Sequence, residues 1–186
     1  MEGRPLQEVD LIERSRNGDV VAFEQLVRAH QDVAIRVAHL VVRDHAEAED
    51  VTQESFVKAY AALSGFRAGS PFRPWLLKIV RNEALNRVRS AKRRHQLAIR
   101  EASDPVSGGA APSPETLVVT RSDQATVLAA IDALPERYRA VLTHRFLLEF
   151  SERETALVLG IPLGTVKSRT SRGLERLRHI LGEDQM

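Results

Sequence analysis

The sequence predicts an all-α protein built from two small helical domains joined by a flexible linker. Apolar residues recur at helical spacing along nearly the whole chain. Residues 101–116 are rich in Gly, Pro, Ser and Ala, a composition typical of a linker. No segment shows the strict apolar–polar alternation of a half-buried strand. We therefore expect domains at residues 1–98 and 117–186, with a linker at 99–116.

The composition limits what kind of protein this chain can be. Apolar residues make up 43% of the 186 residues, which is enough for a hydrophobic core. The absence of cysteine rules out disulfides, thiolate nucleophiles and cysteine-bound zinc. No apolar run approaches the roughly 20 residues of a membrane helix, and the charged N-terminus is unlike a secretory signal. We expect a cytoplasmic protein with no membrane insertion.

Four helices are expected in the first half. Asn17-Gly18 ends the first helix, Asp19 can cap the second, and Ser64-Gly65 ends the third before a loop at 65–71. Pro71 and Pro74 are tolerated only near the first turn of the fourth. The expected helices span residues 5–16, 19–42, 46–63 and 71–92. The apolar face of the fourth is Phe72, Trp75, Leu76, Ile79, Val80 and Ala84.

Four more helices are expected in the second half. Ser151 and Glu154 fit a capping box at the start of the third of these, and Gly160 ends it. A short turn follows, after which Thr165 can cap the last helix. The expected helices span residues 117–134, 136–148, 151–159 and 165–181.

The charge distribution points to a polyanion partner. Residues 67–100 carry ten basic side chains and one acidic side chain, whereas residues 1–66 and 101–186 are both net acidic. A solvated helix face would normally include more interspersed acidic residues. The block therefore favours contact with nucleic acid.

The segment SERETALVLGIPLGTVKSRTSRGLERLR predicts a helix-turn-helix, because a capped helix and a tight turn precede a basic second helix. The N-terminal end of that second helix would enter a DNA major groove. The alternative is an ordinary helical hairpin with a charged face. The candidate contacts for DNA are Thr165, Lys167, Ser168, Arg169, Ser171 and Arg172.

The fourth helix carries a second candidate site. Lys78, Arg81, Asn82, Asn86 and Arg89 lie off the apolar face, and such a set suits phosphates and one or two bases. Phe66, Arg67 and Phe72 in and beside the preceding loop could contact unpaired bases if they are exposed. Partial burial in the core is the alternative for these aromatic residues, and Trp75 fits the core better than a stacking role.

An acidic stripe forms the third candidate site, on the helix expected at 46–63. Glu47, Asp50, Gln53, Glu54 and Val57 would share one face, which suits docking onto a basic helical partner. A merely solvated acidic face is the alternative. The six histidines lack metal-binding spacing, and no Gly-rich phosphate loop occurs. The sequence thus predicts neither an enzyme nor a bound metal or cofactor.

Four segments occur in the order AEDVTQESFVKAY, FRAGSPFRPWLLKIVRNEALNRVR, LPERYRAVL and LGIPLGTVKSRTSRGLERLR. Together they closely resemble the extracytoplasmic-function (ECF) group of bacterial sigma factors, over about residues 6–95 and 117–181. The resemblance implies sigma-2-like and sigma-4-like domains and core RNA polymerase, promoter DNA and a separate anti-sigma factor as partners.

The resemblance also implies residue roles. Asp50, Gln53 and Glu54 would dock on the coiled coil of the polymerase β′ subunit, and the first helices of the second domain would approach the β flap. The 65–71 loop with Asn82 would hold a flipped base of the minus-ten element, and Asn86 and the basic residues of that helix would hold the neighbouring non-template strand. Lys167, Ser168, Ser171 and Arg172 would contact the minus-thirty-five element.

The chain departs from the family pattern at two places. Glu149-Phe150 replaces a frequent Gly-Leu, and Thr155 replaces a frequent aliphatic residue. Two other classes stay open from the sequence. A stand-alone helix-turn-helix regulator would leave the acidic stripe without a role, and an adaptor or anti-sigma antagonist would not bind DNA through its second domain.

Overall fold

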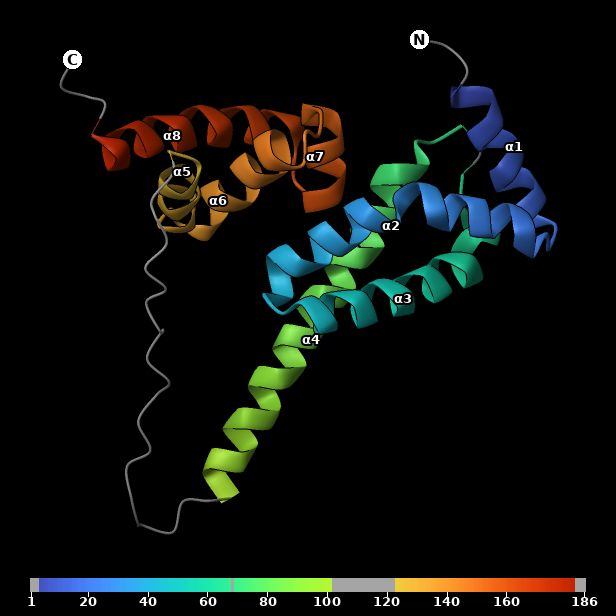
Figure 1. The fold of residues 1–186 in the computed structure, drawn as a ribbon, viewed down its shortest axis with the longest axis horizontal. Helices are drawn as coiled ribbons and strands as arrows, with labels where there is room; N and C mark the ends of the chain where they lie inside the picture. The colour runs from blue at the N-terminus through green and yellow to red at the C-terminus, as the bar shows by residue number, and fades with distance from the viewer. Residues whose placement is uncertain (1–3, 68, 102–122, 183–186) are drawn as a thin grey trace. The chain divides into compact units, whose positions relative to one another are not determined.

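The structure, a computed structural model, describes residues 4–67, 69–101 and 123–182, which form helices joined by turns and short loops (Figure 1). Two compact units are found, Met1–Ser90 with Arg153–Ile161 and Ala91–Glu152 with Pro162–Met186. No strand occurs among the described residues. The predicted all-α, two-domain fold is confirmed.

The first unit begins with three helices, α1 (Arg4–Arg16), α2 (Val20–Val42) and α3 (His45–Ala62), and α2 packs against both of the others. A single turn of 3-10 helix (Leu63–Gly65) then leads through the loop to α4 (Phe72–Glu101). The helices predicted at 5–16, 19–42 and 46–63 agree with α1, α2 and α3 to within a residue or two.

Helix α4 is longer than the sequence analysis expected, because it continues past Lys92 to Glu101. Residues 93–101 contain no Gly or Pro and consist largely of helix-favouring types, so no stop signal ends the helix at Lys92. Residues 99–101, which were assigned to the linker, are therefore helical. The remainder of the predicted linker lies outside the described residues.

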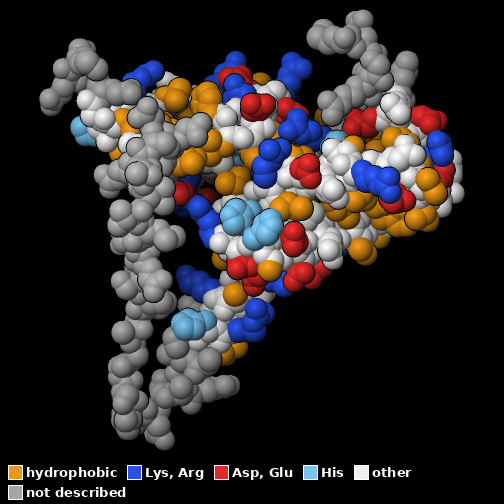
Figure 2. All heavy atoms as spheres, viewed as in Figure 1, with side chains coloured by type: hydrophobic (Ala, Val, Ile, Leu, Met, Phe, Trp, Pro, Cys, Tyr) orange, Lys and Arg blue, Asp and Glu red, His pale blue; other side chains and the backbone are white. Residues whose placement is uncertain are grey.

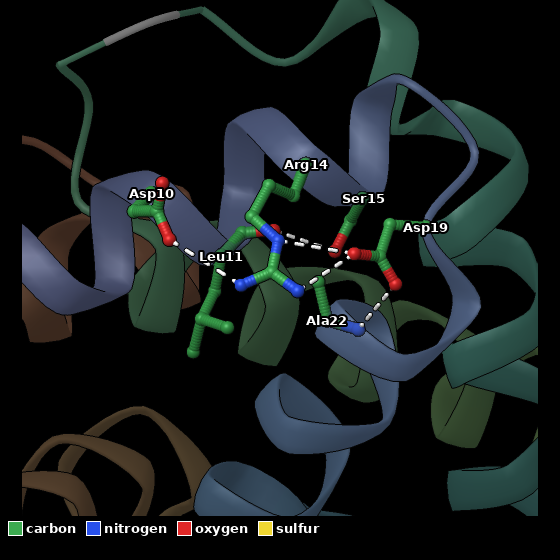
Figure 3. Close-up of polar contacts among 6 residues, drawn as sticks. All are labelled: Asp10, Leu11, Arg14, Ser15, Asp19 and Ala22. Atoms are coloured by element: carbon green, nitrogen blue, oxygen red, sulfur yellow. Dashed lines mark hydrogen bonds and ion pairs between the residues drawn. The ribbon is translucent and has the colours of Figure 1, made fainter.

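A polar cluster fixes the turn between α1 and α2 (Figure 3). Asp19 caps α2, since its Oδ1 accepts a hydrogen bond from the Ala22 amide at 3.0 Å. The Arg14 guanidinium lies 2.8 Å from Asp19 Oδ2 and 3.6 Å from Asp10 Oδ2. The Ala22 hydrogen bond and Arg14 lower the pKa of Asp19, so this cap is fully effective at neutral pH and weakens as the pH falls through that lowered pKa.

The core of the first unit is mainly apolar but also contains buried polar side chains, among them Ser15, His30 and Ser55. His30 is buried on α2, and its Nε2 lies 3.0 Å from Glu8 Oε1 of α1. The ring centroid of His30 is also 5.5 Å from that of Phe72 of α4. This histidine therefore links three helices. The fully buried side chains around them include Leu26, Val37, Val51, Leu76 and Val80.

The second half contains α5 (Asp123–Asp132), α6 (Glu136–Leu142), a wide π-type turn (Thr143–Leu147), α7 (Glu152–Leu159) and α8 (Leu163–Leu181). The turn completes the helix expected at 136–148. The part of the first expected helix before residue 123 lies outside the described residues.

Tyr138 lies at the centre of the second unit. With Leu134 and Leu142 it forms a buried cluster against which Leu174 and Leu177 of α8 pack. The Arg176 guanidinium sits 5.2 Å from the Tyr138 ring centroid. A hydrogen bond with Arg137, together with the charges of Arg137 and Arg176, lowers the pKa of the Tyr138 hydroxyl. These contacts hold α6 against α8, the helix that carries the candidate DNA contacts.

Gly173 lets α8 approach α6 closely. A Cβ at this position would lie 3.2–3.3 Å from three side-chain atoms of Leu142, which is itself fully buried. We expect Gly173→Val to lower the free energy of unfolding by about 1–3 kcal/mol, because the added methyl groups overpack this contact. Thermal unfolding of the whole chain measures the change.

Gly173→Ala is the control, because the smaller clash is offset by the roughly 1 kcal/mol by which Ala favours a helix over Gly. If the valine variant were as stable as the alanine variant, the close approach of α6 and α8 would not be limited by this contact.

The Glu149-Phe150 pair, where the chain departs from the family pattern, lies at a left-handed turn of the backbone. Glu149 has a φ of 55°, a left-handed conformation that glycine adopts readily and other residues rarely do. Phe150 is buried, its ring centroid lies 5.6 Å from that of His144, and its carbonyl accepts a hydrogen bond from Arg145. The frequent glycine of the family thus corresponds to a position that requires a positive φ.

We expect Glu149→Gly to raise the free energy of unfolding by up to about 1 kcal/mol, since relief of strain exceeds the added freedom of the unfolded chain. Glu149→Ala, which removes the carboxylate but keeps the Cβ, should give no such gain in a thermal or urea melt. Equal effects of the two variants would assign any change to the charge instead of the backbone.

Candidate functional site

Helix α4 has one buried face and one polar face. Phe72, Leu76, Leu77, Val80 and Ala84 are buried, and they hold the helix in the first unit. Lys78, Asn82, Asn86 and Arg89 are exposed at spacings of four, four and three residues, so they share a face, with Arg81 half-buried beside it. The structure therefore brings together the five residues of this helix that the sequence predicted.

Two ion pairs fasten α4 to α3. Arg87 Nη2 donates to Glu54 Oε1 at 2.6 Å, and Lys58 Nζ donates to Glu83. The sequence alone does not predict these pairs, because they join residues 25 and 33 positions apart. Their side chains serve the α3–α4 contact, which leaves the polar face of α4 to Lys78, Asn82, Asn86 and Arg89.

The aromatic residues Phe66 and Phe72 are buried, so the alternative of packing in the core holds, and the contact with unpaired bases that required their exposure does not. Phe66 is 4% exposed and Phe72 is 1% exposed. The Phe66 ring centroid lies 4.9 Å from that of half-buried Trp75 and 5.7 Å from that of Phe72, so the three rings form one cluster. Burial of these rings against one another is more favourable than leaving them exposed to water, because it removes apolar surface from solvent.

A surface hollow lies beside this aromatic cluster. Gly65, Phe66 and Arg67 line it from the loop, and Ser70 and Lys78 also face it. Arg67 is exposed and Ser70 is half-buried. A hollow with an aromatic wall and polar rim can accept a planar base, in which case Phe66 acts as a wall and not as an exposed platform.

The acidic stripe of α3 is exposed as predicted. The side chains of Asp50 and Gln53 reach the surface, and Val57 on the same face is 71% exposed. Glu54 is also exposed but is engaged by Arg87, so only part of its charge is available to a partner. An exposed valine at the end of the acidic stripe favours a docking surface over a purely solvated face.

Helices α7 and α8 are separated by a short turn in which Gly160 has a φ of 67°, as its predicted role as a helix stop requires. The prediction that Thr165 caps α8 is wrong. The helix begins at Leu163, Pro162 occupies the cap position, and the Thr165 amide donates to the Pro162 carbonyl at 2.9 Å. Pro162 makes no side-chain hydrogen bond to the helix, but its ring fixes φ at a value compatible with the start of a helix.

Helix α8 presents a compact polar surface near its N-terminal end. Lys167, Ser168, Ser171 and Arg172 are exposed on neighbouring turns, whereas Thr165 and Arg169 are half-buried. The face turned inward carries Val166 and Gly173, both buried. Lys167 Nζ lies 3.9 Å from Glu152 Oε2, and such a long, exposed ion pair contributes little to stability.

The second departure from the family pattern, Thr155, is fully buried on α7, and its hydroxyl has no hydrogen-bond partner. A buried hydroxyl without a partner costs stability, which explains why an aliphatic residue is frequent at this position. Ser151 is the residue directly before α7, which is the position where the predicted capping box places its serine.

Within the described chain, no cluster of three or more His, Asp or Glu side chains has the arrangement of a metal site. None of the helices in these ranges combines the length and apolar character that crossing a membrane requires.

A helix-turn-helix with an exposed basic surface in one half and a helix with an exposed polar face in the other are the features expected of a transcription initiation factor of the sigma-70 type. Residues 26–94 match the family model Sigma-70 region 2, and residues 124–177 match Sigma-70, region 4. The chain belongs to the ECF group of RNA polymerase sigma factors.

Relatives match almost over their full lengths. The RNA polymerase sigma-H factor of Pseudomonas aeruginosa is 37% identical over 177 residues, covering 92% of both chains. The ECF RNA polymerase sigma-E factor of Escherichia coli K12 is 38% identical over 175 residues, covering 90% of both.

Two solved structures also resemble the chain. One is CnrH in complex with the cytosolic domain of CnrY, with a TM-score of 0.67 and 25% identity over 96% of this chain and 99% of that one. The other is the sigma factor RpoE in complex with the anti-sigma factor NepR from Bartonella quintana, with a TM-score of 0.63 and 27% identity over 88% and 98%.

Proposed function

We propose that this sigma factor reads promoters through two separate surfaces, the polar face of α4 for the opened minus-ten element and the N-terminal surface of α8 for the duplex minus-thirty-five element. The observation that carries the proposal is that both surfaces are exposed and polar while the opposite face of each helix is buried. In this proposal residues 1–98 and 117–186 act as separate domains, and residues between them connect the two surfaces.

The first surface would capture an unpaired base in the hollow beside Arg67 and Ser70. Asn82 supplies an amide that can bond bidentately with a base edge. Asn86, Lys78, Arg81 and Arg89 would hold the phosphates of the displaced strand. Melting in this mechanism is driven by binding energy, so the chain itself performs no covalent step and needs no cofactor; the polymerase carries out the chemistry.

Docking on the polymerase would use the acidic stripe of α3. Asp50 and Gln53, with the part of Glu54 that Arg87 leaves available, would contact the coiled coil of the β′ subunit. The first helices of the second domain would approach the β flap. Because the chain would act with polymerase on chromosomal DNA, its proposed place of action is the cytoplasm.

Control by a separate anti-sigma factor is part of the proposal. The similar RpoE structure was solved with an anti-sigma factor bound, and the similar CnrH structure with the cytosolic domain of CnrY. An anti-sigma partner would act here by covering the surfaces used for polymerase and DNA.

Arg172→Ala is expected to weaken recognition of the minus-thirty-five element by about 1–3 kcal/mol, if the guanidinium makes a good contact with a guanine edge. Binding of the reconstituted holoenzyme to promoters with single-base changes in that element measures the effect. The exposed Arg178, more than one turn further along α8, is a matched control. An unchanged base preference in Arg172→Ala would remove this residue from the reading surface.

The dependence of DNA opening on polymerase tests the proposal as a whole. We expect unpaired thymines at the promoter to become reactive to permanganate only when the chain and core polymerase are both present. A stand-alone regulator would instead bind its duplex site equally well without polymerase and would not open it, which would contradict the proposed function.

A further inference from the structure

His30 is a buried histidine that the proposed function does not use. Four of the six histidines are exposed, and Figure 2 shows histidine side chains at the surface, whereas His30 lies in the core of the first unit. A buried imidazole costs stability unless it is hydrogen-bonded, and an apolar side chain would fill the same space without that cost. Packing alone therefore does not explain a histidine at this position.

Glu8 of α1 fixes the orientation of the His30 ring. Its Oε1 lies 3.0 Å from His30 Nε2, and because a carboxylate only accepts hydrogen bonds, this nitrogen donates. Glu8 is half-buried and His30 is buried, so the pair reaches from the margin of the first unit into its core. A ring bonded in this way is held in one orientation, which apolar packing alone specifies less sharply.

The His30 ring continues directly into the aromatic cluster next to α4. Its centroid lies 5.5 Å from that of Phe72, with the two ring planes tilted by 47°. The Phe72 centroid in turn lies 5.7 Å from that of Phe66 and 5.5 Å from that of Trp75. Because Phe72 is fully buried in a close-packed core, a change in its position also moves the rings that it contacts.

Two rings of this cluster form a wall of the surface hollow. Phe66 and Trp75 line the hollow, and buried Phe72 packs against both of them. A base in the hollow would meet these two rings, and the attraction between rings depends on their spacing and tilt. The series of contacts from Glu8 through His30 and Phe72 thus ends at the surface proposed to hold the flipped base.

Helix α1 also contacts the turn that leads into the hollow. Arg16 Nη2 donates a hydrogen bond to the Ser64 carbonyl at 3.3 Å. Ser64 directly precedes Gly65, which lines the hollow. The match to Sigma-70 region 2 begins at residue 26, so α1 and its residues Glu8 and Arg16 lie outside it. Helix α1 therefore reaches the hollow by two separate contacts that the family model does not include.

We propose that His30, oriented by Glu8, is a positioning residue that sets the geometry of the hollow for the unpaired base. It acts through Phe72, which passes its position on to Phe66 and Trp75, and its burial keeps it from contacting DNA itself. This inference rests on the proposed function, because it requires that the hollow holds a base. It adds to that function a role for α1 in promoter opening.

The test uses the full chain with core polymerase and two forked templates whose minus-ten strand is unpaired. One template has its natural base at the captured position, which is the position where loss of the base weakens binding by the unsubstituted chain most. The other has an abasic site there. On the intact template His30→Leu and Glu8→Ala should each lower the affinity by about 2- to 10-fold, the size of one aromatic pair. On the abasic template both should bind as tightly as the unsubstituted chain.

Ser55→Ala is the control, because it removes another buried polar group of the first unit, a hydroxyl that donates to the Val51 carbonyl within α3 at 2.6 Å. It should leave the affinity for both templates unchanged. Thermal unfolding of each variant shows whether it is folded. Glu8 lies at the margin of the core, so Glu8→Ala carries the test if His30→Leu does not fold.

An equal loss of affinity on both templates would overturn the inference, because His30 would then be an ordinary core residue that serves only stability. Unchanged affinity on the intact template would overturn it as well. Failure of the proposed function looks different. In that case the unsubstituted chain with polymerase would bind intact and abasic templates equally well at every position of the minus-ten element, and the inference would fall with it.

Discussion

Asp50→Lys is expected to weaken the association of this sigma factor with core RNA polymerase by about 10- to 100-fold at low salt, since it places a cation against a basic partner. The difference from the unsubstituted chain should shrink as salt is added, because the pair is exposed and screened. Asp50 is the cleanest position for this test, because Glu54 also holds Arg87 of α4 at 2.6 Å. Fluorescence anisotropy of labelled chain with core polymerase measures the affinity.

Glu49→Lys provides the matched control, with the same change of charge on the same helix but at the edge of the stripe, next to His45. It should have a much smaller effect. Normal polymerase binding by Asp50→Lys would show that the acidic stripe is only solvated.

Glu54→Lys is expected to act in two ways. It should weaken polymerase binding and also lower the thermal stability of the first unit, because it opposes Arg87 with a like charge. Adding Arg87→Glu should restore the stability by remaking the pair in reverse, without restoring polymerase binding.

Asn82→Ala is expected to lower the extent of open-complex formation by a factor of about 5–150, corresponding to the 1–3 kcal/mol of a bidentate contact with a base. Asn82 is exposed, so its loss should not disturb the fold. The fluorescence of 2-aminopurine in the minus-ten element reports opening, and anisotropy reports polymerase binding in the same samples.

Gln31→Ala, which removes an exposed amide from α2, is the control for Asn82→Ala. It should leave both readings unchanged. A loss of polymerase binding as large as the loss of opening would contradict the role of Asn82 in holding a base.

Much of this molecule could be predicted from the sequence because local signals agree with each other. Asp19, Gly160 and the apolar periodicity set helix boundaries that the structure reproduces. The polar face of α4 followed from spacing alone, since a helix with one buried face must expose the other.

The differences from prediction arose where distant residues decide the outcome. Phe66 is buried because Trp75 and Phe72 pack against it, and a loop sequence does not reveal such contacts. The pairing of Arg87 with Glu54 joins residues 33 positions apart. Helix α8 begins at Leu163 because Pro162 occupies the N-cap position. The sequence favoured Thr165 for that position, since threonine is a common N-cap residue.

The central claim is that the chain confers promoter selectivity on polymerase through two surfaces. The most direct measurement is transcription in vitro from a library of randomised promoters by core polymerase with and without the chain, followed by sequencing of the transcribed templates. We predict enrichment of templates that share two separated elements, with the upstream preference lost in Arg172→Ala and the downstream preference lost in Asn82→Ala. Transcription that the chain neither stimulates nor restricts to shared elements would contradict it.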